Sequence, residues 1–310
     1  MTRQYEEMPE PIFIIGAPRS GTSAMNWAIG QHPNIQVMPE TSWIASFATG
    51  AMSSYRKGSE RGRFSHLSNV SFPSDIFYSH VAECVDNIVN DVYETRCRQL
   101  YGNYETEGIK INPANPNAPY QVRRSPDDPK SRWIDATPLN SHFAWAIAMI
   151  FPRAKFIHNV RNPADVALSL ENFDRVGARA LSLSRGLRTW MQHTENAWLA
   201  EKAFGPERVF RLEFERLESE PEAMMRDVLD FLDEDWSEAC LEPLARKTNS
   251  SEVGDKQPNL VKRIFNRLAY RKATALYEAL HQPVSEAARR DASRKLEENF
   301  ESHLAQRPLL

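Results

Sequence analysis

Residues 12–23 read Ile-Phe-Ile-Ile-Gly-Ala-Pro-Arg-Ser-Gly-Thr-Ser, a continuous apolar run followed at once by a turn that contains two glycines. Continuous rather than alternating hydrophobicity predicts a strand that is buried on both faces, as in a parallel sheet. Residues 24–31 then have a helical pattern, with Thr22 or Ser23 as the predicted cap. A glycine-rich turn between such a strand and a helix presents backbone N–H groups to an anion. The stretch therefore predicts a phosphate-binding loop.

The same strand-and-helix pattern recurs along the chain. We predict further strands over 35–38, 155–160 and 209–212, and helices over 141–150, 164–173, 221–232 and 285–304. Strands that alternate with helices predict an α/β fold, here a P-loop-type three-layer fold with a central mainly parallel sheet flanked by helices. Polar, Gly- or Pro-rich composition predicts long loops over 53–74 and 111–130. Because the pattern resumes after each loop, we predict a single domain over residues 1–310, with 1–10 flexible.

Composition limits the function classes. The 310 residues carry a formal net charge of −3, which argues against broad binding to nucleic acids or membrane surfaces. The longest apolar run, residues 143–151, falls well short of the roughly 20 residues that a membrane span needs. Cys84, Cys97 and Cys240 are widely spaced and odd in number, which argues against a disulfide framework. We therefore expect a soluble, cytoplasmic protein that binds no nucleic acid and has no membrane span.

The loop departs from the phosphate loop of nucleoside triphosphatases at one position. Gly16 and Gly21 have the spacing of the GxxxxGK[ST] motif, but Thr22 stands where that motif has the lysine that reaches the β- and γ-phosphates. The cation lies inside the loop instead, at Arg19. An in-loop arginine without the lysine suits a donor that has no γ-phosphate.

Two segments carry a family resemblance. Pro18-Arg19-Ser20-Gly21-Thr22-Ser23 resembles the 5′-phosphosulfate loop of the sulfotransferases, above all the branch with bacterial and tyrosylprotein sulfotransferases. The segment Arg161-Asn-Pro-Ala-Asp-Val-Ala-Leu-Ser169 is similar to the family's 3′-phosphate element. The resemblance implies 3′-phosphoadenosine-5′-phosphosulfate (PAPS) as donor, adenosine 3′,5′-bisphosphate (PAP) as product, and no metal. It implies these donor-binding residues: Pro18, Arg19, Ser20, Gly21, Thr22, Ser23, Arg161 and Ser169.

The general base is the next residue to assign. Glu40-Thr41 follows the predicted second strand, at the spacing from Arg19 at which tyrosylprotein sulfotransferases have a Glu-Thr pair whose Glu is the base. The resemblance thus implies that Glu40 is the general base and that Arg19 is the second catalytic residue. An acidic residue that merely starts a helix is the plainer interpretation of Glu40.

Histidines are rival bases, as in the cytosolic small-molecule sulfotransferases. The candidates are His32, His142 and His158, and the position of His158 inside a predicted buried strand favours a core role. Ala136 stands where many relatives have lysine, which removes a cation near the bond that breaks.

Other assignments stay open at the level of sequence. The alternatives to a sulfotransferase are a P-loop nucleoside-phosphate kinase and a catalytically impaired nucleotide-binding protein on the same fold. The acceptor is a hydroxyl or amine of a small molecule, glycan, lipid or peptide, and a homodimer is left open. The basic segment 56–63 is either a solvated surface loop or a lid that closes over the donor or meets an acidic acceptor. Lys247 and Lys256 are candidates for a further 3′-phosphate contact.

Overall fold

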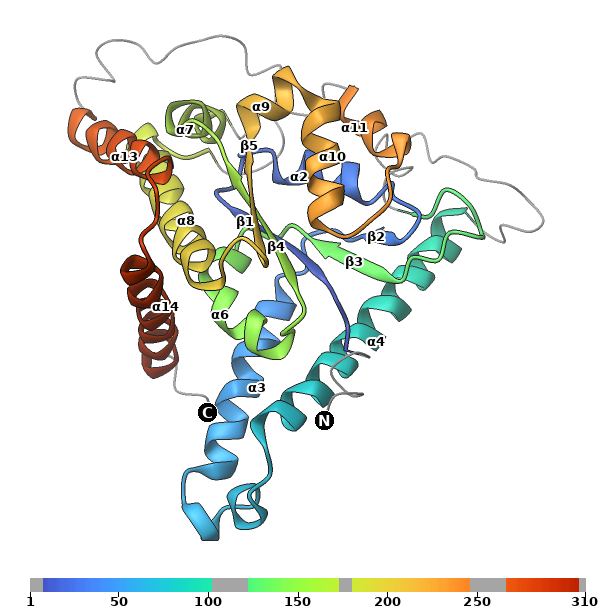
Figure 1. The fold of residues 1–310 in the computed structure, drawn as a ribbon, viewed down its shortest axis with the longest axis vertical. Helices are drawn as coiled ribbons and strands as arrows, with labels where there is room; N and C mark the ends of the chain where they lie inside the picture. Colours follow the sequence, from blue (N-terminus) through green and yellow to red (C-terminus); the bar gives the residue numbers. More distant parts are fainter. Residues whose placement is uncertain (1–7, 102–121, 173–179, 246–265, 307–310) are drawn as a thin grey trace.

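The computed structural model describes residues 8–101, 122–172, 180–245 and 266–306 (Figure 1). Its centre is a five-stranded sheet in the order β2-β3-β1-β4-β5, in which every pair of neighbouring strands is parallel. The strands are β1 (Ile12–Gly16), β2 (Ile35–Val37), β3 (Arg132–Asp135), β4 (Lys155–Val160) and β5 (Val209–Glu213). All carboxyl ends of these strands therefore lie at one edge of the sheet.

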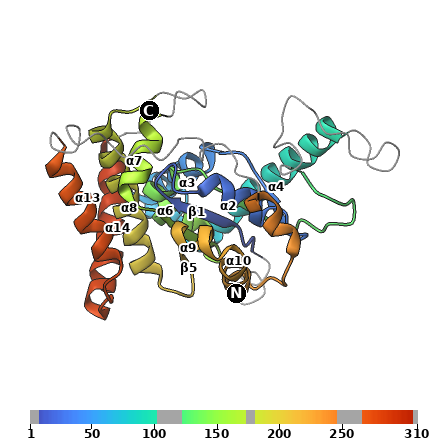
Figure 2. The same ribbon diagram turned by 90° about the horizontal axis from the view of Figure 1, so that it is seen from above.

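Helices cover both faces of the sheet (Figures 1 and 2). They are α2 (Thr22–Ile29), α3 (Trp43–Ser59), α4 (Ser74–Tyr101), α6 (Asn140–Ile150), α7 (Pro163–Glu171), α8 (Leu183–Phe204), α9 (Phe214–Ser219), α10 (Pro221–Phe231), α11 (Glu242–Ala245), α13 (Arg267–Leu280) and α14 (Glu286–Gln306). Three short 3₁₀ helices are η1 (Gly62–Phe64), η2 (Ser68–Val70) and η5 (Glu238–Leu241).

The central strand β1 shows why the fold has three layers. Phe13 and Ile15 pack into a core formed with α3, α4, α6, α8 and α14. Ile12 and Ile14 point the other way, into a core formed with α2 and α10. All four side chains are fully buried, because successive residues of a strand face opposite sides of the sheet. The predicted α/β fold with a central parallel sheet flanked by helices is confirmed.

Several local predictions are confirmed and others are wrong. The predicted strand over 155–160 and the helices near 141–150, 164–173, 221–232 and 285–304 are present. The N-cap of α2 is Gly21, and Thr22 and Ser23 lie inside the helix, so the predicted cap is wrong. Sequence reasoning did not identify β3, α4, α8 or α13.

The predicted loop over 53–74 is also wrong in its first part. Helix α3 continues through Ser59, because Ala45, Ala48 and Met52 form a buried face that packs against the core. Burial of an apolar face outweighs the low helix propensity of Gly and Ser in this segment. In the other predicted loop, residues 111–121 lie outside the described residues, and 122–130 contain neither helix nor strand. Residues 1–7 of the predicted flexible segment also lie outside them.

Candidate functional site

The loop between β1 and α2 begins and ends at glycines that its shape requires. Gly16 has φ +135°, and a Cβ added there would lie 2.4 Å from the carbonyl oxygen of Asn159 on β4. Gly21 has φ +91°, and a Cβ there would lie 2.4 Å from the ring of Phe214. Both conformations favour glycine over any other residue. The backbone thus stays close to β4 and to the start of α9 where it turns into α2.

The N-terminus of α2 is open toward the loop. No side chain caps the helix, and its first turn holds no acidic residue. The first N–H groups of a helix have no partner within the helix, and the helix dipole makes that end favourable for an anion. Ser23 in this turn is exposed and Thr22 is buried. The backbone and the exposed hydroxyl of Ser23 are available to a phosphate or sulfate group.

Ser20 has a different role from its neighbours. Its hydroxyl is fully buried and donates a hydrogen bond of 2.6 Å to the carbonyl oxygen of Ala17. This bond closes the turn upon itself and stabilises the loop. Pro18 precedes Arg19 and is partly exposed. The Ser20 side chain therefore shapes the loop, and its contact with the donor stays a prediction.

The structure brings the two predicted donor elements together. Arg19 Nε donates to Ser169 Oγ on α7 at 2.9 Å, across 150 residues of sequence. Arg161, which follows β4, donates from Nη1 to the carbonyl oxygen of Arg19 at 3.2 Å. Strands β1 and β4 are hydrogen-bonded neighbours. The carboxyl ends of adjacent parallel strands meet at one edge, where ligands of open α/β sheets bind.

Arg161 is held from two further sides. Its guanidinium lies over the ring of Phe214 at 4.1 Å from the centroid, and its carbonyl oxygen accepts from Trp190 Nε1 at 3.0 Å. Partial burial lowers the pKa of Arg19, and the positive charge of Arg161 lowers it further. The two positive charges repel each other, and an anion bound to both guanidinium groups would relieve the repulsion.

Glu40 lies at the same carboxyl edge of the sheet, after β2. Its side chain is exposed, and its pKa is raised, first by partial loss of hydration and then by the negative charge of Asp135. Asn26 of α2 donates to the carbonyl oxygen of Met38 at 2.7 Å and so ties the segment before Glu40 to the helix of the phosphate loop. A carboxylate with a raised pKa is a better proton acceptor than an ordinary glutamate.

Asp135 organises the segment that carries Glu40. It is the last residue of β3 and is fully buried. One carboxylate oxygen accepts from Thr41 Oγ1 at 2.8 Å and the other from Thr137 Oγ1 at 2.6 Å. Thr137 Oγ1 in turn accepts from the Thr41 backbone N–H at 2.8 Å, and Asn140 also donates to Asp135. Burial raises the pKa of Asp135, and these hydrogen bonds oppose the rise.

This network bears on the kinase alternative. Sequence alone shows no clear Mg²⁺-binding aspartate at the end of a buried strand, yet β3 ends in Asp135 beside β1. The signal was present in Trp-Ile-Asp at 133–135, but three apolar and polar residues are too few to identify a strand by periodicity. Both oxygens of Asp135 are occupied by hydrogen-bond donors. Among the described residues no group of three or more His, Cys, Asp and Glu side chains could hold a metal ion.

A pair of histidines lies next to this network. The rings of His142 on α6 and His193 on α8 meet edge to face at 4.4 Å. His193 Nδ1 lies 3.0 Å from the carbonyl oxygen of Pro138, next to Thr137. Burial and the neighbouring His142 lower the pKa of His193 to about 4. Sequence reasoning named His142 but missed His193, since nothing in the unrecognised helix α8 pointed to this edge.

The other two histidine candidates have structural partners. His158 is fully buried within β4 and lies 2.7 Å from Glu201, which also binds Arg211. The core role predicted for His158 is confirmed. His32 is buried after α2, where Nε2 lies 3.0 Å from the carbonyl oxygen of Asp235.

Other candidates lie away from the loop or outside the described residues. Ala136 is buried in the core between the sheet and α2. The basic segment 56–63 begins within α3 and continues beyond it, at the opposite end of that helix from Glu40, so the hypothesis of a lid over the donor is wrong (Figure 1). Lys247 and Lys256 lie outside the described residues.

Comparison with known proteins identifies the family of this chain. A model of the family described as "Sulfotransferase family" matches residues 11–238. A protein-tyrosine sulfotransferase of Drosophila melanogaster is 24% identical over 267 residues, which cover 82% of this chain and 46% of that protein. An uncharacterized protein of Aquifex aeolicus is 24% identical over 80% of this chain and 28% of its own length. The chain thus spans less than half the length of these relatives.

Solved structures with some similarity come from bacteria. The sulfotransferase domain of the Synechococcus PCC 7002 olefin synthase has a TM-score of 0.45 at 20% identity, covering 95% of this chain and 96% of that domain. A sulfotransferase from Alicyclobacillus acidocaldarius has a TM-score of 0.44 at 18% identity, covering 91% of this chain and 98% of that one. The family model covers most of the chain, and the chain therefore belongs to the sulfotransferase family.

Proposed function

We propose that this member of the sulfotransferase family transfers a sulfuryl group from PAPS to a hydroxyl or amine acceptor, with Glu40 as general base. The observation that carries the proposal is the meeting of Arg19, Ser169 and Arg161 at the carboxyl ends of β1 and β4. A donor with both a 5′-phosphosulfate and a 3′-phosphate needs two anion sites. The proposal supplies one from the loop and α2, and the other from α7 and the residue after β4.

The donor residues divide into two groups in this proposal. The backbone N–H groups of the loop, with Thr22 and Ser23 at the start of α2, bind the 5′-phosphosulfate. Arg161 and Ser169 bind the 3′-phosphate. The guanidinium of Arg19, which lies beside Ser169, stabilises negative charge between the 5′-phosphosulfate and the 3′-phosphate. Ser20 supports the loop through its bond to Ala17.

The transfer itself requires a proton acceptor on the acceptor side. The acceptor oxygen or nitrogen attacks sulfur, its bond to sulfur forms, and the bond from sulfur to the bridging oxygen breaks. The electron pair of that bond stays on the 5′-phosphate of PAP, and the acceptor's proton passes to the Glu40 carboxylate. The raised pKa of Glu40 supports this role, since the pKa of an efficient general base lies near the pH at which the enzyme works.

Two alternatives remain on the same fold. A kinase needs a lysine after Gly21 and a carboxylate free for Mg²⁺, whereas this chain has Thr22 and an Asp135 whose oxygens accept several hydrogen bonds. A catalytically impaired binding protein is motivated by Ala136, where relatives often have lysine. We favour the enzyme because Glu40 is exposed and has a raised pKa.

The first experiment separates donor from triphosphate. PAP at 100 times its Kd should raise the melting temperature by about 4 °C, because binding to the native state adds about 2.7 kcal/mol to a chain of 310 residues. ATP with Mg²⁺ should raise it by much less. The opposite order of the two ligands would overturn the proposed donor and support a kinase.

The second experiment tests the base. Radiolabelled sulfur from PAPS is followed into a panel of phenols, sugars, aliphatic alcohols and tyrosine peptides. Glu40→Gln should lower kcat by roughly 10²–10⁴-fold without weakening PAP binding, whereas the control Glu222→Gln, an exposed glutamate of α10, should not. Since Glu40 must be ionised to accept the proton, kcat/KM should rise with pH through a pKa above the ordinary 4.5. A wild type that binds PAP but sulfates nothing would support the impaired binding protein.

A further inference from the structure

The segment between α3 and α4 forms a projecting tip, defined here as residues 58–72. Helix α3 starts three residues after Glu40 and has 17 residues, so it carries the chain about 25 Å away from the phosphate loop. Figure 1 shows η1 and η2 at the far end of this projection, beyond the rest of the molecule. The tip is therefore the part of the described chain that stands farthest from the proposed active site and is free to meet a separate surface.

Internal hydrogen bonds give the tip a defined shape. The backbone N–H of Leu67 donates to Gly58 O at 2.9 Å, and Ser68 Oγ donates to Ser59 O at 3.1 Å. Asn69 Nδ2 donates to Arg63 O at 2.7 Å. At the base of the tip, Tyr55 OH donates to Phe72 O at 2.7 Å. These bonds fix which side chains point inward and which point outward.

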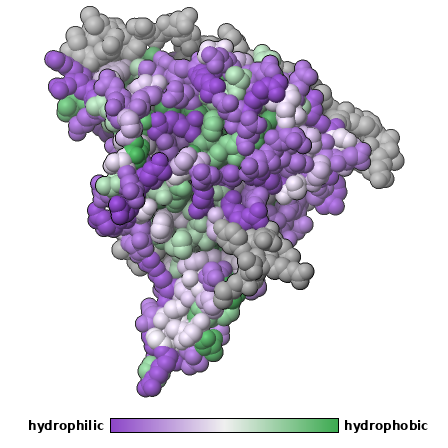
Figure 3. Space-filling model, in the orientation of Figure 1, coloured by the Kyte–Doolittle hydropathy of each residue, from purple (hydrophilic) through white to green (hydrophobic). Residues whose placement is uncertain are grey.

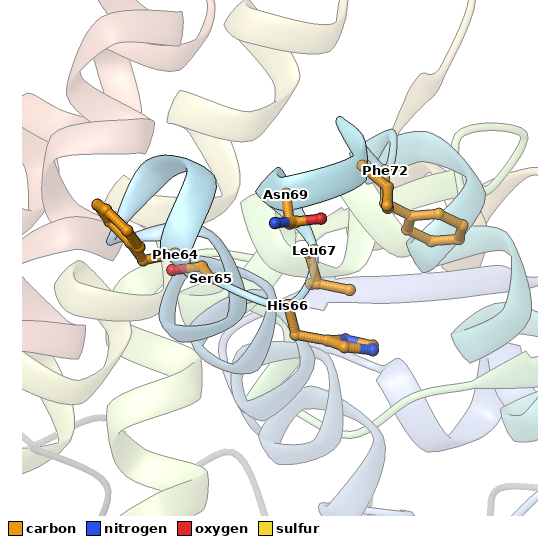
Figure 4. A pocket seen from close by; sticks show the side chains of 7 residues that line it. Phe64, Ser65, His66, Leu67, Asn69 and Phe72 are labelled. Carbon is orange, nitrogen blue, oxygen red and sulfur yellow. The ribbon is translucent and has the colours of Figure 1, made fainter.

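Two apolar side chains point outward from this rigid frame. Phe64 is 70% exposed and Val70 is 69% exposed, while Leu67 between them packs against Gly58. Figure 4 shows Phe64 turned away from Leu67 and Phe72, across a pocket of about 390 Å³ that these residues help to line. An exposed phenylalanine on a rigid turn leaves apolar surface in water, where it contributes nothing to the stability of the fold. A second surface that buried Phe64 and Val70 would gain the hydrophobic free energy of that burial.

Basic residues surround the apolar pair. Arg61 and Arg63 flank Gly62 and are exposed, and the guanidinium of Arg63 lies over the Phe64 ring at 4.9 Å. Neither arginine has an acidic partner within 4 Å among the described residues. The tip contains two basic side chains, Arg61 and Arg63, and one acidic side chain, Glu60, while Arg56 just before it is paired with Glu301. The tip is locally positive although the whole chain has a net charge of −3.

We propose that the tip docks onto an anionic lipid bilayer, with Phe64 and Val70 entering the headgroup region and Arg61 and Arg63 contacting lipid phosphates. Apolar side chains beside basic ones are the pattern of proteins that lie on a membrane interface without spanning it. Figure 3 shows apolar and hydrophilic surface side by side at the lower end of the molecule. A net charge of −3 works against broad adsorption, so contact would be confined to this end. The proposal is independent of the donor and the base.

Vesicle flotation tests the proposal with the full chain. Wild type should float with vesicles of phosphatidylcholine and phosphatidylserine, and much less with phosphatidylcholine alone. Phe64→Asp with Val70→Asp should reduce the bound fraction at least tenfold. Arg61→Ser with Arg63→Ser should reduce the partition coefficient by about fivefold for each charge removed, and added salt should have the same effect.

Matched controls lie on α13, at another end of the molecule (Figure 1). Leu268 is 67% exposed, so Leu268→Asp changes an equally exposed apolar residue, and Arg267→Ser with Arg271→Ser removes two exposed charges. These variants should float as wild type does. Each variant's melting temperature identifies any that unfolds, and a misfolded pair is replaced by the milder Phe64→Ser.

Three outcomes would overturn the proposal. The first is a wild type that stays unbound at anionic vesicles in low salt. The second is a tip variant that keeps its melting temperature and floats as well as wild type. The third is a tip variant that converts a dimer to a monomer in sedimentation while vesicle binding is absent, which would make the tip an interface between two copies of the chain.

Discussion

Arg19 adopts a backbone conformation that is unusual for its residue type. Its φ of +71° lies in the left-handed region, which costs a non-glycine residue roughly 1–3 kcal/mol. The cost is offset by the bonds it enables, since Nε reaches Ser169 and the carbonyl oxygen faces Arg161. Strain of this kind at a predicted ligand contact supports a binding role for Arg19. A lysine there would keep the charge but lose the forked geometry.

Ser169 offers the sharpest test at the scale of single residues. Ser169→Ala should weaken PAP binding by about 10- to 150-fold, because a hydrogen bond to a charged phosphate contributes about 1.5–3 kcal/mol. Adenosine 5′-phosphate lacks the 3′-phosphate, so its weaker binding should be unchanged. Titration calorimetry of both nucleotides with wild type and variant measures the ratio.

A control variant is compared by the same ratio of affinities for PAP and adenosine 5′-phosphate. Ser219→Ala removes an exposed hydroxyl that bonds only to its own helix, and it should leave both nucleotides unaffected. Equal loss of affinity for the two nucleotides in Ser169→Ala would contradict a 3′-phosphate role and would point to a general change in the loop.

At the scale of elements, the junction of β1 and α2 depends on β5 and α9. Phe214, the first residue of α9, occupies the space beside Gly21 and also supports the Arg161 guanidinium. One aromatic ring therefore sets the position of both the loop and the predicted 3′-phosphate contact. The three strands β1, β4 and β5 must be in register before the site exists.

Gly21→Ala should destabilise the protein and weaken donor binding together. The new Cβ would meet the Phe214 ring at 2.4 Å in a conformation with φ +91°, which we expect to cost about 1–3 kcal/mol. Gly50 is the matched control: it lies inside α3 with nothing within 4 Å of its added Cβ. Gly50→Ala should stabilise the protein by up to about 1 kcal/mol. Urea denaturation gives both values, and equal effects of the two substitutions would contradict this account.

At the scale of the whole molecule, the proposed acceptor side is assembled from distant parts of the chain. The segment with Glu40 is bonded to the end of β3, and the chain after β3 is bonded in turn to α8 through Pro138 and His193. Helix α8 also supplies Trp190, which fixes the residue after β4. This helix therefore connects the proposed donor side to the proposed acceptor side.

His193 should make the stability of the fold depend on pH. Its pKa is about 4 in the folded protein against an ordinary value of 6.5, so between these values the unfolded chain binds more protons. Stability should rise as pH rises from 4 to 6.5 and level off above it. As pH falls from 6.5 to 4, the free energy of unfolding of wild type should therefore decrease by roughly 2–3 kcal/mol from this group alone.

The comparison with His193→Gln isolates this contribution, because the carboxylates titrate in both proteins. The difference in unfolding free energy between wild type and variant should be largest at pH 7 and should shrink or reverse near pH 4. A difference that stays constant with pH would contradict the low pKa of His193. Urea titrations at several pH values measure it.

Sequence by itself determined the features that depend on neighbouring residues. The apolar run of β1, the glycines that its turn requires, and the apolar face of α10 are local patterns, so strand, loop and helix were predictable. The family resemblance rested on the same local segments, and the family match over residues 11–238 agrees with it. The residue roles and the donor stay predictions for the experiments above.

Only the tertiary structure decided what depends on contacts between distant residues. The bond from Arg19 to Ser169 joins positions 150 residues apart, and the bonds of Asp135 to Thr41 join positions 94 residues apart. No periodicity in the sequence records such pairs. Helix α3 runs through Gly- and Ser-rich sequence because a buried face, not local propensity, stabilises it. The register of the sheet and the packing of α8 thus determine where Glu40 lies relative to the loop, and the length of α3 determines how far the tip lies from both.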